Sequence, residues 1–205
     1  EQGRLCAEAA EALGIAAGVP VSYRAGDQPN NAYSLRVLEP GELAATAGTS
    51  GVVYGITDRI NPDPLSRVNS FVHVNDSAGA MRNGILLCIN GTGSSYTWMR
   101  KNLAFSGYQQ MNELAATAPP GSRGLSFFPF GNGAERMLGN RQVGAQWLGL
   151  DFNRHHRGHL CRAAQEGIAF AFRYGIKGME ATGLAPKRIR AGNANLFLSP
   201  TFRDT

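Results

Sequence analysis

Residues 42–56 read Glu-Leu-Ala-Ala-Thr-Ala-Gly-Thr-Ser-Gly-Val-Val-Tyr-Gly-Ile, and this stretch indicates how the chain folds. Two runs rich in apolar and β-branched residues, 42–47 and 52–56, flank a short turn and predict two strands joined by glycine-flanked residues. The turn Gly48-Thr49-Ser50-Gly51 offers two hydroxyls and several free amides, which suits phosphate oxygens. No lysine follows it, so it is not a Walker A loop. As an ordinary hairpin turn it would need no ligand.

Further strands and helices are expected on both sides of this hairpin. Hydrophobic patterns and turn residues predict strands at 19–25, 69–74, 84–89 and 187–191 and helices at 30–37, 94–101, 108–118 and 159–182. Small residues in the last of these helices, such as Gly167 and Gly175, would let another backbone approach closely. Strands come first and helices alternate with them later, which predicts an α/β fold with a mixed sheet.

Composition excludes several classes of protein. The 205 residues are 43% apolar and 17% charged, enough for one packed core and unlike a disordered chain. The net charge is +5, but the arginines are scattered, which favours a mildly basic surface over a nucleic-acid site. Apolar stretches such as 84–89 fall far short of the roughly 20 residues of a membrane span. Three well-separated cysteines suggest reduced thiols in a cytoplasm.

Three glycine-containing passages are candidate sites. Asp27 follows Gly26 just past the predicted strand at 19–25, a place where α/β folds often hold reacting groups, although an aspartate there more commonly caps the next helix. The passage at 90–96, which includes Gly93, leads from strand to helix. It lacks the third glycine of a dinucleotide fingerprint, but leaves anion binding at the helix N-terminus open. Gly192 and Asn193 form another glycine turn at a strand end.

A histidine cluster invites a metal hypothesis. His155 and His159 lie four residues apart, with His156 between them. Three arginines at 154, 157 and 162 would repel a cation, and Gly158 weakens helix formation there. We therefore expect no metal site and interpret the cluster as the solvated start of a helix.

Five ordered segments resemble the second half of the FGGY family of carbohydrate kinases. The resemblance begins with Gly26-Asp27, a small helix, Pro40-Gly41-Glu42 and the stretch 47–54, and continues through 93–100, 128–136 and 145–150 to 159–166. Around Asp27 and Thr49 the chain is most similar to the xylulokinases. Gln165 departs from the family pattern, because an apolar residue is expected at that position.

The resemblance implies an actin-like ATPase fold, a ribonuclease-H-like α/β lobe with a mixed sheet flanked by helices. Residues 1–205 would form the C-terminal, nucleotide-binding lobe, facing an N-terminal lobe that holds most of the sugar site. Glu1 starts directly in a helical pattern and Ser199-Pro200 starts a helix just before the chain stops, so truncation at both ends is expected. The resemblance leaves a homodimer open, and no nucleic-acid or membrane partner is expected.

The activity implied is transfer of a phosphoryl group from ATP, with Mg²⁺, to a sugar hydroxyl, foremost D-xylulose to D-xylulose 5-phosphate. Alternatives are a kinase for gluconate, glycerol, ribulose or rhamnulose, and a non-catalytic actin-like nucleotide-binding module. The family pattern assigns Asp27 as catalytic base. It assigns the nucleotide contacts to Gly48, Thr49, Ser50, Gly93, Gly192 and Asn193, although Asn193 stands where the family commonly has a second glycine.

Overall fold

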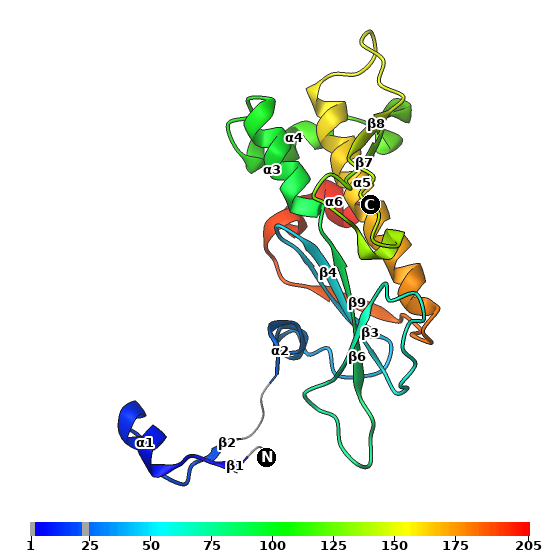
Figure 1. The fold of residues 1–205 in the computed structure, drawn as a ribbon. Coiled ribbons are helices and arrows are strands. Elements are labelled where there is room, and N and C mark those ends of the chain that lie inside the picture. The colour runs from blue at the N-terminus through cyan, green and yellow to red at the C-terminus, as the bar shows by residue number, and fades with distance from the viewer. Residues whose placement is uncertain (1–2, 22–24) are drawn as a thin grey trace.

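The computed structural model describes residues 3–21 and 25–205 (Figure 1). In this part of the chain the main sheet has five strands, in the order β5-β6-β4-β3-β9. Their bounds are β3 (Glu42–Ala47), β4 (Gly51–Thr57), β5 (Asn69–Val72), β6 (Asn83–Ile89) and β9 (Arg188–Ala191). Strands β3 and β9 run parallel, whereas β3–β4, β4–β6 and β5–β6 are antiparallel. The predicted α/β fold with a mixed sheet is therefore confirmed.

Side chains alternate between the two faces of the sheet, and both faces are covered at the central strands β3, β4 and β6, whereas the edge strands β5 and β9 are largely exposed. Leu43, Val53 and Leu87 share one hydrophobic cluster with the long helix α5 (Arg157–Glu180). Tyr54 and neighbouring residues of the other face form a second cluster with residues in and just after helix α2 (Asp27–Ser34). Strands covered on both sides are apolar almost throughout, which explains the continuous apolar runs in β4 and β6.

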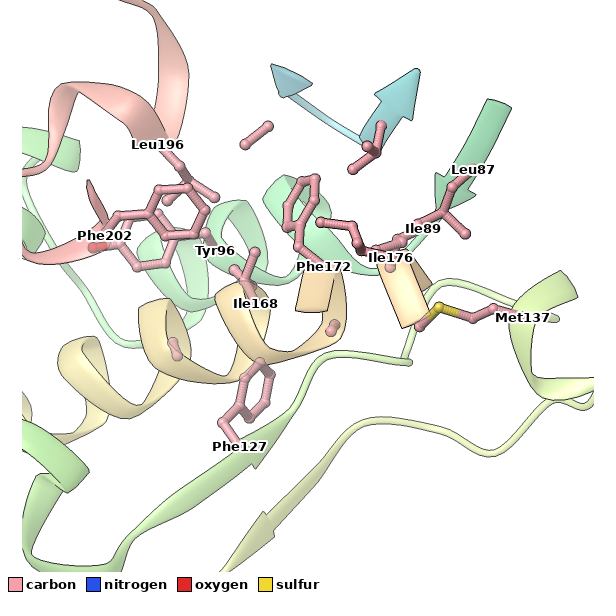
Figure 2. Packing of buried hydrophobic residues seen from close by; sticks show 14 of the residues in the cluster. Leu87, Ile89, Tyr96, Phe127, Met137, Ile168, Phe172, Ile176, Leu196 and Phe202 are labelled. Atoms are coloured by element: carbon pink, nitrogen blue, oxygen red, sulfur yellow. The ribbon is translucent and has the colours of Figure 1, made fainter. Parts of the chain in front are cut away.

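Helix α5 packs closely against its neighbours through glycine. A Cβ on Gly167 would lie 2.1 Å from the carbonyl oxygen of Phe127, in strand β7 (Ser126–Phe128), and one on Gly175 would lie 2.2 Å from Leu87 Cδ2. Figure 2 shows Phe127 on one side of the helix and Leu87 on the other. The close approach expected from the small residues of this helix is confirmed.

Two glycines of α5 give a matched stability test. Gly167→Ala would force the Phe127 backbone to move and is expected to lower the free energy of unfolding by about 1–3 kcal/mol. On the same helix, a Cβ at Gly178 would meet nothing nearer than Arg67, at 3.9 Å. Gly178→Ala is therefore expected to add about 0.5–1 kcal/mol. Urea denaturation of both variants measures the difference, and equal effects at the two positions would contradict this packing.

The remaining elements lie around the sheet. Helices α3 and α4 and strands β7 and β8 gather with α6 toward one end of the sheet, while α1 with β1 and β2 lies apart, beyond α2 (Figure 1). Within the described ranges no helix is both long and apolar enough to cross a membrane. The bounds are β1 (Gly3–Arg4), α1 (Ala7–Leu13), β2 (Pro20–Val21), α3 (Thr92–Asn102), α4 (Tyr108–Thr117), β8 (Gln146–Leu148) and α6 (Pro200–Asp204), with 3-10 helices at Pro120–Gly124, Arg136–Leu138 and Asn195–Leu198 (η3).

Most predicted elements occur where the sequence places them, and the differences have local causes. The helix expected at 30–37 begins earlier, at Asp27, because Gly26 takes the extended N-cap conformation. The strand expected at 19–25 is limited to Pro20–Val21 in the described residues, and positions 22–24 lie outside them. The first helix begins at Ala7 rather than at the start of the chain, and it ends at Gly14, which takes the left-handed conformation.

Candidate functional site

A cavity of about 740 Å³ lies between the β3–β4 turn, helices α3 and α4, and the segment from η3 to the start of α6. It brings Gly93 together with Gly48 and Thr49, which the sequence places more than 40 residues earlier. Its lining comprises Ala47, Gly48, Thr49, Gly93, Tyr96, Thr97, Tyr108, Gln109, Asn112, Glu113, Ala116, Asn195, Leu196, Leu198 and Pro200. The volume falls in the usual range of small-molecule sites, roughly 300–1,000 Å³.

The first turn of α3 holds the β3–β4 turn in place. The backbone N–H of Gly93 donates to Gly48 O at 3.1 Å, and that of Ser94 donates to Thr49 O at 2.9 Å. A Cβ on Gly93 would lie 2.0 Å from Gly48 O, so only glycine permits this contact. The backbone N–H groups of residues 48–50 have no partner in the described part of the chain, which leaves them available to an anion.

The loop before α3 is fixed by a buried carboxylate. Glu135, which is fully buried, accepts hydrogen bonds from the backbone N–H groups of Asn90 at 3.1 Å and Gly91 at 3.0 Å. Burial raises the pKa of this carboxyl. Together with the bonds of Gly93 and Ser94, these contacts pair four backbone amides at and before the start of α3 within the protein. Anion binding at that helix terminus, which the sequence left open, stays a prediction, and the β3–β4 turn offers an anion more unpaired amides.

Helices α3 and α4 supply an aromatic and polar wall that sequence reasoning missed. The rings of Tyr96 and Tyr108 stack with centroids 6.0 Å apart, and the hydroxyls of Thr97 and Tyr108 lie 2.8 Å apart. Asn112 lines the cavity one turn further along α4. The signal was present in the recurrence of polar residues at 108–109 and 112–113, a helical spacing that brings them to one face.

The predicted nucleotide residues do not all line this cavity. Gly192 and Asn193 are exposed and precede the lining segment, in which Asn195 takes a left-handed φ of 54°. A Cβ on Gly48 would be 3.6 Å from Asn195 Nδ2, so this segment closes over the turn. Ser50 is not among the lining residues.

Asp27 stands outside the cavity, at the first residue of α2. Its side chain is exposed and accepts a hydrogen bond from the backbone N–H of Gln28 at 2.9 Å. The N-cap of the helix is Gly26, so Asp27 is an acidic residue of the first turn rather than the capping residue. The side chains of Asp27 and Thr49 both face solvent, and neither is turned into the protein interior.

The histidine cluster caps helix α5. The Nδ1 atoms of His155, His156 and His159 accept backbone N–H groups of Asp151 at 3.0 Å, Gly158 at 3.2 Å and His156 at 3.3 Å, respectively. The expectation that Gly158 weakens a helix at this point is wrong, because α5 begins at Arg157. Helix α4 packs on that glycine so closely that a Cβ would lie 2.6 Å from Thr117 Oγ1.

This cap makes the fold sensitive to acid. Burial, followed by the charges of His156, His155 and Arg123, lowers the pKa of His159 below its ordinary value of 6.5. The folded protein keeps this imidazole neutral while the unfolded chain protonates it near pH 6.5. The free energy of unfolding should therefore be fully retained above that pH and decline as the pH falls below it. Burial likewise lowers the pKa of His73, which adds in the same direction.

Thermal unfolding between pH 8 and pH 5.5 measures this decline. In His159→Asn an amide oxygen can accept the same N–H of His156, but it does not titrate. The variant should therefore show a shallower decline of Tm with acidification than the wild type. An identical pH dependence in the two proteins would contradict the assignment.

Comparisons with known proteins connect this geometry to a family. Residues 43–192 match the FGGY family of carbohydrate kinases, C-terminal domain. The xylulose kinase of Haemophilus influenzae is 32% identical over 187 residues, covering 89% of this chain and 36% of that protein. The gluconokinase of Bacillus licheniformis is 29% identical over 169 residues, covering 80% of this chain and 33% of that protein.

The fold has a counterpart among solved structures. The crystal structure of xylulose kinase from Rhodospirillum rubrum superposes with a TM-score of 0.85 and 28% identity, covering 98% of this chain and 40% of that one. The expected actin-like α/β lobe is thereby confirmed. The present chain spans about a third of the length of the curated relatives that it matches, 36% and 33% in the two cases above.

Proposed function

The chain belongs to the FGGY family of carbohydrate kinases, and on that premise we propose that it is the nucleotide-binding lobe of an ATP-dependent sugar kinase. Residues 1–205 would form this lobe, and a separate N-terminal lobe would hold most of the sugar site. The proposed reaction converts D-xylulose to D-xylulose 5-phosphate. The observation that carries the proposal is the cavity in which a turn with free amides meets an aromatic and polar wall.

Different sides of the cavity suit the phosphates and the base of ATP. The free amides of the β3–β4 turn and the exposed Thr49 side chain would bind phosphate oxygens. The wall of Tyr108 and Asn112, with the segment from Asn195 to Pro200 opposite, would enclose the base. Gly192 and Asn193 would lie at the outer margin of the nucleotide, since they precede the lining segment. Ser50 would act through the backbone of the turn.

Charge supports Mg²⁺ as the companion of the nucleotide. None of the described residues that line the cavity is Lys or Arg, so a triphosphate would meet no cationic side chain there. Mg²⁺ bound to the phosphates would supply the charge neutralisation that phosphoryl transfer requires. The turn amides would then orient the phosphates rather than neutralise them.

Asp27 is the proposed general base. A sugar hydroxyl is a weak nucleophile, and a carboxylate within hydrogen-bond reach can accept its proton as the oxygen attacks phosphorus. The exposed position of Asp27 at the first turn of α2 leaves the carboxylate accessible to an acceptor held by a second lobe. A non-catalytic nucleotide-binding module would not require such a group.

The sugar is argued from relatives, because the sugar pocket would lie mostly in the other lobe. The relative named xylulose kinase is 32% identical and favours D-xylulose, whereas the relative named gluconokinase, 29% identical, makes gluconate the second candidate.

Titration of the chain with ATP and Mg²⁺ tests the nucleotide site. A coupled assay of a protein that carries both lobes (the two-lobed kinase) against a panel of ketoses and polyols tests the sugar. No ATP binding, or turnover confined to another sugar, would overturn the corresponding part.

A further inference from the structure

Gln165, in the middle of α5, is a polar residue with no exposed surface. It stands where the family pattern has an apolar side chain. Its Nε2 donates to the Tyr96 hydroxyl at 2.8 Å and to Asn112 Oδ1 at 3.0 Å, and its Oε1 accepts from the Ser199 hydroxyl at 2.8 Å. Every polar atom of this buried amide is therefore paired, as burial of such a group requires.

The three partners of Gln165 come from three separate segments around the cavity. Tyr96 of α3 and Asn112 of α4 line it directly. Ser199 lies between Leu198 and Pro200, which both line it, and its buried hydroxyl bonds to Gln165 instead of capping α6. One side chain of α5 thus joins the α3–α4 wall to the 195–200 segment from beneath the cavity.

The network also fixes the direction of the Asn112 amide. Asn112 Oδ1 accepts from the Tyr96 hydroxyl at 3.1 Å as well as from Gln165, which uses both lone pairs of the amide oxygen. The amide nitrogen must then point away from the network. Asn112 is only half-buried, it lines the cavity, and its Nδ2 has no partner in the described ranges.

We propose that Gln165 is a positioning residue for nucleotide recognition, which presents Asn112 Nδ2 as a fixed donor to a ring nitrogen at the edge of the bound base. This inference rests on the proposed nucleotide site. In this arrangement the buried Gln165 side chain does not touch the nucleotide and acts on its binding only through Asn112. Binding of the phosphates at the β3–β4 turn should not depend on Gln165.

Titration with two ligands separates this role from a merely structural one. In Gln165→Met, Asn112 Oδ1 keeps only the bond from Tyr96, so its amide is held less firmly, and the Kd for ATP should rise about tenfold, the worth of one hydrogen bond. The Kd for inorganic tripolyphosphate with Mg²⁺, which has no base, should stay unchanged. Asn112→Leu should weaken ATP to a similar degree, and the Gln165→Met, Asn112→Leu double variant should bind ATP no worse than Asn112→Leu alone. Gln146→Met, on the exposed face of β8, is the control.

The outcomes separate failure of the positioning role of Gln165 from failure of the proposed nucleotide site. If the wild-type chain binds neither ATP nor tripolyphosphate, the proposed nucleotide site fails. If it binds both, three results would overturn the positioning role. These are an unchanged ATP affinity in Gln165→Met, an equal loss of affinity for ATP and for tripolyphosphate, and losses of ATP affinity that add up in the double variant. Should Gln165→Met not fold, Asn112→Leu carries the test, because it removes the donor without changing the charge of the cavity. It must then weaken ATP about tenfold and spare tripolyphosphate, and any other result overturns the proposal.

Discussion

Replacing Asp27 by alanine in the two-lobed kinase is expected to lower kcat for sugar phosphorylation by about 10²–10⁴, the usual contribution of a general base. The Kd for ATP should stay unchanged, because Asp27 lies outside the cavity that we assign to the nucleotide. Steady-state assays combined with ATP titration of the same preparation measure both quantities.

Two further variants test whether the loss of activity in Asp27→Ala comes from the missing carboxylate. Asp27→Asn retains an oxygen for the N–H of Gln28 but is a far weaker proton acceptor, so it should lose as much activity as alanine. Asp58→Ala removes an exposed carboxylate that pairs only loosely with Arg59, at 3.7 Å, and should leave turnover intact. Substantial turnover by Asp27→Asn, or loss of ATP binding along with activity, would exclude the proposed role.

Gly93→Ala is expected to weaken ATP binding by about 10²-fold. The new Cβ would lie 2.0 Å from Gly48 O, so the β3–β4 turn must move away from α3 and lose the bonds from Gly93 and Ser94. Hydrogen bonds to a charged group are worth roughly 1.5–3 kcal/mol each, so displacing the amides that face the phosphates has a large effect. The free energy of unfolding should fall by about 1–3 kcal/mol in addition.

Gly107→Ala is the matched control for this substitution. Gly107 precedes α4, has no positive φ, and would place a Cβ with nothing within 4 Å. The Gly107→Ala variant should bind ATP with the affinity of the wild type. Normal ATP binding by Gly93→Ala, measured by calorimetry, would show that the turn does not hold the phosphates.

The sequence predicts the parts of this molecule that local chemistry determines. The hairpin around Gly48 and the helix of α5 follow from patterns within single segments, and Gly48, Thr49 and Gly93 were identified because turn glycines carry a local signature. The wall formed by α4 was missed, since its polar face becomes a binding surface only when α3 and α6 pack beside it. Gln165 was noticed as a departure from the family pattern, but its role depends on partners 34 to 69 residues away.

The parallel pairing of β3 with β9 has a consequence for how the protein is made. Glu42 pairs with Arg188, so the whole segment between these two residues must leave the ribosome before β9 can join β3 in the sheet. Contacts of such long sequence separation carry a large loop-closure entropy and slow folding. Residues 195–200 emerge later still, and the cavity that they line cannot be complete before then. Until then the core residues that pack against Leu196 and Phe202 are exposed to aggregation and to chaperones.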